Sequence, residues 1–388
     1  MLLLATLLSR LAGRMFTLAI VLYGVTQAGS AELAGWLAFA ALAPGLVISP
    51  IAGSLIDRLG SAWAITVDLT ASAVFVAALA MAAEVGGTNA AVLLTLTACF
   101  SLTSPLSFAG IRALLPRLVS RAALDRANAL DTAIHGLTDV AGPALAGLIV
   151  GLGHPSVAFG MIAVIYAAAA VCIGRMGRIE ASLPQLAPVL IEAWHGLRRV
   201  LGQPTLRGLA LSYALYEACW GMLVVIVPMF AAQHFAGGAG ATVAGLLWAG
   251  LGLVGGTTAL VAGHLRAAGR ERRLMAFGML VTALAVWPLA AWFGLTGLVV
   301  GLMLVGAAAG PIDVGVLTLR QRRTDAAELG RVVAISMSLN FSGGPIGSAL
   351  AGGLVAWSIS GAFSVAATAA LLAACAVALI PADEAGLC

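Results

Sequence analysis

The hydrophobic residues of this 388-residue chain fall into long, uninterrupted runs that short polar segments separate. Each run has the length, about 20 residues, that an α-helix needs to cross the hydrocarbon core of a bilayer. Barrel strands are shorter and alternate between polar and apolar positions, so the runs predict helices. The runs lie at residues 2–27, 33–56, 62–83, 90–114, 126–151, 155–174, 208–232, 240–264, 274–293, 296–319, 330–356 and 360–381.

The twelve runs predict an all-α membrane protein of twelve transmembrane helices in two six-helix halves. The halves cover residues 1–174 and 208–388, and a polar linker at 175–207 joins them. The linker contains an amphipathic stretch from Val189 to Leu201, which suits a helix lying in the cytoplasmic membrane surface. The lipid bilayer is therefore the first partner that the sequence predicts.

The two halves also repeat one another in sequence. Residues 126–150 align with residues 331–355, with Arg, Ala, Leu, Gly and Val in register, and residues 52–55 align with 262–265. Such parallel repeats predict two pseudo-symmetric halves related by an axis along the membrane normal, a device known from transporters.

The charged residues support this topology. They make up 9% of the chain, against roughly 25% in soluble domains, so an ordinary soluble enzyme is excluded. Every basic residue is Arg, and every second loop is basic, as at Arg58, Arg121 and Arg270. The positive-inside rule then places the basic loops, both termini and the linker in the cytoplasm. The spread of Arg over many loops argues against a nucleic-acid partner.

Other chemistry is excluded by what the sequence lacks. The five cysteines form no CxxC pair and no Cys/His pair at zinc spacing, so we expect no disulfide framework, metal site or cofactor. The chain has no Lys and hence no phosphate-binding GxxxxGK[ST] loop, which excludes ATP-driven transport by this chain alone. The stretch from Met1 to Ser9 lacks a basic leader and is predicted to begin the first helix.

A glycine-rich loop with two charges separates the second and third runs. Its sequence is Gly53-Ser-Leu-Ile-Asp57-Arg58-Leu-Gly60, where glycines allow a tight turn and the charges can pair at a helix end. With twelve spans and a repeat, the chain resembles the major facilitator superfamily, whose loop motif is G-x-L-x-D-R-x-G. The resemblance implies that Gly53, Asp57, Arg58 and Gly60 form a cytoplasmic gate that latches the outward-facing state, although Ser61 and Ala62 replace two basic residues of the family pattern.

Two further motifs narrow the resemblance to one branch. Gly142-Pro143 and Gly147 in the fifth run resemble the Gly-Pro motif of antiporters, and Gly344-Pro345 stands in the eleventh. Because Pro removes a helix hydrogen bond, these positions are expected to act as hinges, with close helix packing as the alternative. The segments RANAL from Arg126, EAWHGLR from Glu192 and Gly330-Arg331 resemble the bacterial macrolide and siderophore exporters among drug:proton antiporters. The resemblance to these bacterial exporters implies that the spans lie in a bacterial inner membrane.

Ionisable residues inside the runs are the candidates for coupling, because leaving them in lipid costs several kcal/mol. Asp131, His135 and Asp139 recur every four residues on one helical face, and Glu217 and Asp313 lie in later runs. A packing seam of hydrogen bonds is the alternative. Arg14 cannot lose its proton, so it needs an anionic partner such as Asp131, Asp139, Glu217 or a substrate acid. The substrate-cavity candidates are Arg14, Tyr213, Tyr216, Trp220 and Asn340.

These observations predict a secondary transporter and not an enzyme. The expected activity is proton-coupled export of small amphiphilic molecules, drug-like or siderophore-like, by alternating access in a functional monomer. Two alternatives remain open. One is an importer or a lipid or lysolipid mover on the same fold. The other is a non-transporting membrane receptor or assembly partner, which would have no reason to place Asp131, His135, Asp139 and Glu217 at midplane depth.

Overall fold

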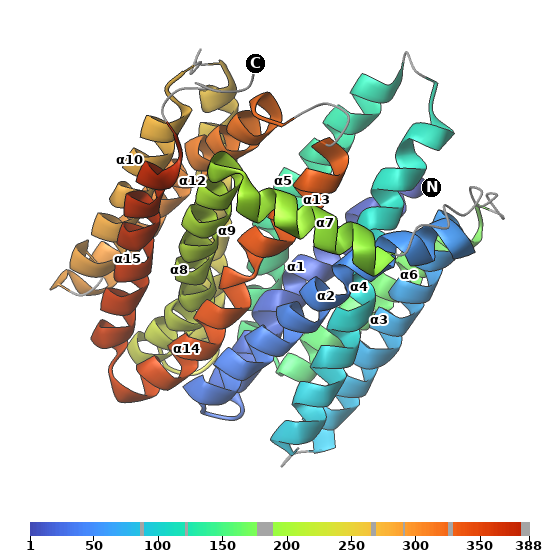
Figure 1. The fold of residues 1–388 in the computed structure, drawn as a ribbon. Helices are drawn as coiled ribbons and strands as arrows, with labels where there is room; N and C mark the ends of the chain where they lie inside the picture. The colour runs from blue at the N-terminus through green and yellow to red at the C-terminus, as the bar shows by residue number, and fades with distance from the viewer. Residues whose placement is uncertain are drawn as a thin grey trace. The chain divides into compact units, whose positions relative to one another are not determined.

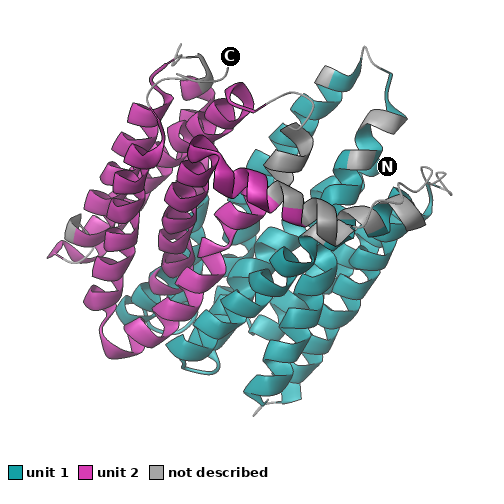
Figure 2. Ribbon diagram, viewed as in Figure 1, with its two compact units in different colours: residues 1–189, 227–249 teal, residues 190–226, 250–388 magenta. Residues whose placement is uncertain are grey.

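The computed structural model describes residues 1–85, 89–120, 123–176, 189–264, 269–289, 292–324 and 329–381. Within these ranges the regular structure is entirely helical, as the hydrophobic runs predicted (Figure 1). The helices cluster by contact into two compact units (Figure 2). Unit 1 contains residues 1–189 and 227–249, and unit 2 contains residues 190–226 and 250–388.

Unit 1 is built from six long helices and from parts of two more. Within it α3 packs against α4 and α6, α2 packs against α4, and α1 packs against α5 and α6. Side chains cap two of the helices, since Ser30 accepts from Leu33 N–H and Asn89 accepts from Ala91 N–H. The helices are α1 Leu2–Thr26, α2 Ala31–Leu59, α3 Ser61–Val85, α4 Ala90–Leu118, α5 Leu124–Leu152 and α6 Pro155–Gly174, with the end of α8 and the beginning of α9.

Unit 2 begins in the linker and contains shorter elements beside its long helices. Its core lies among α8, α10, α12 and α15, around Leu209, Met275 and Ile312. Its elements are α7 Val189–Gly202, α8 Pro204–His234 as far as residue 226, α9 Ala239–His264 from residue 250, α10 Glu271–Leu284, the π-helix η2 Ala285–Leu289, α12 Gly294–Arg322, α13 Leu329–Phe341, α14 Gly343–Trp357, α15 Ile359–Ala376 and the 3₁₀-helix η3 Val377–Leu379.

Ten helices in the described part of the chain are long and apolar enough to cross a membrane. The predicted spans 274–293 and 330–356 each consist of two shorter pieces instead, so the architecture is consistent with twelve crossings. Proline explains both interruptions. Pro288 cannot donate to the carbonyl of Leu284, where α10 ends and η2 begins, and Pro345 cannot donate to the carbonyl of Phe341, where α13 ends.

Glycines allow several helices to touch backbone to backbone. In unit 2 a Cβ at Gly343 or Gly347 would collide with the carbonyl of Ala214 or Ala218, so α14 lies directly against α8. In unit 1 a Cβ at Gly147 would meet the backbone of α9 at Gly245. The beginning of α9 therefore belongs to unit 1 by packing, whereas the sequence repeat groups the whole helix with residues 208–388.

Candidate substrate and proton site

A partly buried ion pair joins α1 to α5 in unit 1. The Arg10 Nη2 atom lies 3.0 Å from Asp131 Oδ1, and the two side chains are 12% and 19% exposed. Nη2 also donates to Asp131 Oδ2 at 3.0 Å, while Nη1 donates to the backbone carbonyl of the same residue at 2.9 Å. Two contacts to the carboxylate and one to the backbone carbonyl thus hold Asp131 against Arg10.

A second ion pair lies farther along the same two helices. Arg14 Nε is 2.6 Å from Asp139 Oδ1, and these side chains are 46% and 32% exposed. The contact is an ion pair by distance, but it is not aligned as a hydrogen bond. His135, one turn before Asp139 on α5, has its Nε2 atom 3.8 Å from Asp139 Oδ2. The structure thus brings Arg14, His135 and Asp139 together, and Asp139 is the anionic partner that the sequence requires for Arg14.

A glycine permits this approach of α1 to α5. A Cβ at Gly142 would collide with the Cβ of Arg14, so only a glycine leaves room for Arg14 at this point. Gly142 therefore has a packing role in addition to its predicted place in a hinge. The helix itself runs through Pro143 without interruption, from Leu124 to Leu152.

Arg112 of α4 adds a third guanidinium to this region. It lies over the ring of Phe108, 4.5 Å from the centroid, and is close enough to Arg10 and Asp131 to interact with both charges. The α1–α4–α5 charge cluster, defined as Arg10, Arg14, Arg112, Asp131 and Asp139, thus holds three guanidiniums and two carboxylates. The sequence did not indicate that Arg10 and Arg112 join this cluster.

The second group of candidates assembles in unit 2, mainly on α8. Tyr213 donates its hydroxyl to Asp313 Oδ1 of α12 at 2.6 Å. The ring of Tyr213 lies 5.7 Å from that of Tyr216, which in turn lies 6.2 Å from that of Trp220. Glu217 is half-buried on the same helix. The predicted grouping of a carboxylate with aromatic rings is present, and Asp313, predicted separately, belongs to it.

Not every predicted cavity residue is open. Tyr216 is 1% exposed and Asn340 is 2% exposed, so both are packed into the interior of unit 2. With its amide oriented to satisfy both neighbours, Asn340 accepts from Arg320 Nη2 at 2.6 Å and donates to the Ser336 carbonyl at 3.0 Å. Arg320 is itself 1% exposed. The sequence carries no sign of this buried guanidinium, because Arg320 lies near the end of a hydrophobic run, close to two other arginines.

The glycine-rich loop is described only in part. The side chains at Gly53, Asp57 and Arg58 lie outside the described residues. Gly60 ends α2 with φ +87°, a conformation that L side chains rarely adopt, and its N–H donates to the Ile56 carbonyl at 2.8 Å. The turn predicted at Gly60 is therefore present.

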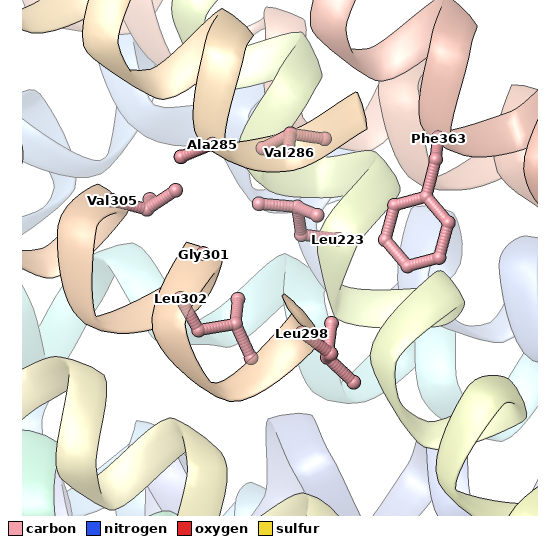
Figure 3. A pocket seen from close by; sticks show the side chains of 8 residues that line it. All are labelled: Leu223, Ala285, Val286, Leu298, Gly301, Leu302, Val305 and Phe363. Carbon is pink, nitrogen blue, oxygen red and sulfur yellow. The ribbon is translucent and has the colours of Figure 1, made fainter. Parts of the chain in front are cut away.

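A small pocket in unit 2 is lined by apolar residues and by none of the charged residues above (Figure 3). It is too narrow to hold a water molecule and borders η2 at Ala285 and Val286. Figure 3 shows that Leu223, Leu298, Val305 and Phe363 complete an entirely hydrophobic lining. This pocket offers packing space but no polar group to orient a substrate.

The described residues contain no group of three or more His, Cys, Asp or Glu side chains that could hold a metal ion. Four cysteines in the same part of the chain, Cys99, Cys172, Cys219 and Cys375, are free thiols.

Membrane-length helices that carry paired charges between them define a multi-pass membrane protein of the transporter class. The chain belongs to the Major Facilitator Superfamily, whose family model matches residues 2–234 and 209–387. It is therefore a transporter and not an enzyme, as the sequence predicted.

Three relatives support this membership. The chain is 50% identical over 382 residues to an uncharacterized MFS-type transporter, y4rN, of Sinorhizobium fredii, covering 98% of this chain and 94% of the relative. It is 30% identical over 343 residues to the multidrug efflux pump Tap of Mycobacterium tuberculosis, covering 84% and 79%. It is 30% identical over 259 residues to the enterobactin exporter EntS of Citrobacter koseri, covering 63% and 59%. The predicted resemblance to the drug and siderophore exporters is confirmed.

A solved structure shares the fold over nearly the full length. The nucleoside transporter NupG superimposes with a TM-score of 0.79 at 13% identity, covering 97% of each chain. The all-α major facilitator fold predicted from the sequence is confirmed by this likeness.

Proposed function

We propose that this transporter exports small amphiphilic molecules across the bacterial inner membrane by alternating access, driven by protons. The names of its relatives Tap and EntS, an efflux pump and an exporter, support the direction. The protein is proposed to act as a monomer with both termini in the cytoplasm, and the two repeated halves at 1–174 and 208–388 are proposed to be its moving parts around the 175–207 linker.

The observation that carries the proton coupling is the Arg14–Asp139–His135 group. The imidazole Nε2 atom of His135 lies 3.8 Å from a carboxylate oxygen of Asp139 inside a membrane span, and both groups can carry a proton. Ionisable groups at such depth are costly and mark proton relays or substrate paths. Asp139 is also about one third exposed, so protons and substrates have access to it.

The contacts rank the coupling candidates. Asp131 is held by three contacts from Arg10 and is proposed to anchor α1 to α5. Asp139 with His135 is proposed as the primary proton site, and Glu217 with Asp313 as the second. The Tyr213–Tyr216–Trp220 rings are proposed to pack against apolar parts of the substrate, while Asp57 and Arg58 gate the cytoplasmic side and Gly142, Pro143, Gly147, Gly344 and Pro345 serve as hinges.

Everted membrane vesicles test the proposal. A panel of amphiphilic dyes is added to vesicles that contain the transporter. Dye uptake is measured with an imposed pH gradient, acidic inside the vesicle, and again after a protonophore collapses that gradient. We expect gradient-dependent uptake into everted vesicles, loss of that dependence in Asp139→Asn, and a shifted pH optimum in His135→Ala. The control Glu32→Gln removes an exposed carboxylate in the first turn of α2 and should transport normally.

Two outcomes would contradict the proposal. Uptake confined to right-side-out vesicles would establish an importer. Dye movement that ignores the proton gradient in wild type and in Asp139→Asn alike would remove proton coupling from this site.

A further inference from the structure

We propose that the substrates carry an acidic group that is ionised at neutral pH, such as a carboxylate or sulfonate, and that Arg14 binds this group in place of Asp139. The inference rests on the proposed function in one respect, that a small amphiphile is transported. It adds the charge of that amphiphile and the residue that selects it.

The first argument is the charge balance of the α1–α4–α5 charge cluster. Three guanidiniums face two carboxylates there, and His135 adds no negative charge in either protonation state. Arg cannot lose its proton, so the excess positive charge is permanent. An anionic substrate neutralises the cluster, whereas a cationic substrate bound to Asp139 would leave Arg14 unpaired and increase the imbalance.

The second argument is the difference between the two ion pairs. Arg10 uses both terminal nitrogens on Asp131 and is 12% exposed. Arg14 contacts Asp139 through Nε and is 46% exposed. Its terminal nitrogens make no hydrogen bond to any of the described residues. The two terminal nitrogens of Arg14 can therefore bind a substrate carboxylate through two parallel hydrogen bonds, the geometry that Arg favours.

The third argument is position. Arg14 lies twelve residues after the first residue of α1, about 18 Å along the helix, which is near the middle of a bilayer core about 30 Å thick. Gly142 brings Arg14 and α5 together at this depth. The acidic group of a substrate replaces Asp139 as the ion-pair partner of Arg14, and no covalent bond is made or broken. Asp139, released from Arg14, then lies beside His135.

Two xanthene dyes of matched ring system test the inference. Fluorescein carries a carboxylate and rhodamine 123 is a cation, and their binding to the purified full-length transporter is measured by fluorescence anisotropy at pH 7.5. We expect fluorescein to bind in preference to rhodamine 123. Arg14→Gln should weaken fluorescein binding at least about tenfold, as expected for loss of a charged hydrogen-bond partner. Arg14→Lys should retain part of the affinity.

Asp139→Asn gives the sharpest contrast. It removes the internal competitor for Arg14, so fluorescein should bind several-fold more tightly, whereas a cationic dye held by Asp139 would bind more weakly. The double variant Arg14→Gln with Asp139→Asn removes both charges and should not bind fluorescein, which covers the case in which Arg14→Gln alone fails to fold. Arg126→Gln, an exposed arginine on the same α5, is the matched control and should bind as wild type.

Failure to bind fluorescein, or rhodamine 123 binding that Asp139→Asn weakens, would overturn the inference. The outcome is separable from that of the proposed function. Arg14-dependent fluorescein binding with no response of dye flux to a proton gradient would leave the anion site standing and remove the proton coupling. Gradient-driven export of rhodamine 123 without export of fluorescein would support the proton coupling and remove the anion site.

Discussion

At the residue scale, an arginine inside a membrane must find a partner, and the two arginines of α1 do so in different ways. Arg10 and Asp131 form a closed pair, while Arg14 and Asp139 form a partly exposed one. The sequence shows that Arg14 needs an acid and names Asp139 among the choices. It does not reveal the Arg10 pair, because an arginine near a helix end is equally compatible with the cytoplasmic surface.

The closed pair predicts a large stability effect. Asp131→Asn should lower the free energy of unfolding by about 1–3 kcal/mol, because it leaves the partly buried Arg10 guanidinium without a counter-charge. Adding Arg10→Gln to the same protein should restore most of that loss. Thermal unfolding of the purified variants measures both. Equal stability of Asp131→Asn and wild type would show that the pair contributes nothing to the fold.

Two substitutions of Asn340 should have different effects on the free energy of unfolding. Asn340→Leu removes the acceptor of the buried Arg320 and should cost about 1.5–3 kcal/mol of unfolding free energy. Asn340→Asp gives Arg320 a carboxylate and should be at least as stable as wild type. Thermal unfolding measures both variants. If Asn340→Asp is less stable than Asn340→Leu, the contact with Arg320 is ruled out.

At the element scale, the hydrophobic runs predict where helices lie but not where they break. Pro143 and Pro345 occur in equivalent parts of the repeat, yet α5 continues through Pro143 while α13 ends before Pro345. Proline alone therefore does not end a helix; at Pro345 it is combined with Gly343, which lies against the backbone of α8. Such contacts depend on packing between distant segments, which periodicity does not contain.

The α8–α14 contact predicts unequal effects of the same substitution along one helix. Gly347→Ala should cost about 1–3 kcal/mol, because its Cβ would collide with the Ala218 carbonyl. Gly353→Ala meets no atom within 4 Å and should be neutral or stabilising by about 0.5–1 kcal/mol through helix propensity. Melting temperatures of the two variants should therefore move apart. Identical shifts would mean that α14 is not tightly packed on α8.

At the whole-molecule scale, length, hydropathy and the repeat predict the fold, because a bilayer demands helices of one length and one composition. For the site, the sequence predicts which residues take part but not which of them pair. Asp131, His135 and Asp139 share a face by helical spacing alone, but the pairing of Arg10 with Asp131 joins residues 121 apart in the chain. Likewise Tyr213 and Asp313, 100 residues apart, meet only in the folded protein.

The alternating basic loops predict the orientation of the entire chain. A reporter enzyme fused after Arg58, Arg121 or Arg270 should remain cytoplasmic, and one fused near Gly87 or Gly238 should be exported, because arginine-rich loops are retained inside. The paired activities of alkaline phosphatase and β-galactosidase fusions measure this. A periplasmic reporter after Arg270 would overturn the count of crossings before it.

The central claim is that proton movement drives substrate movement through this chain. The most direct measurement uses purified transporter in proteoliposomes with equal substrate concentrations on both sides, onto which a pH gradient is imposed. The account predicts that substrate accumulates against its own gradient until nigericin collapses the pH difference, and that Asp139→Asn exchanges substrate without accumulating it. Accumulation that persists after nigericin, or its absence in wild type while exchange proceeds, would contradict the account.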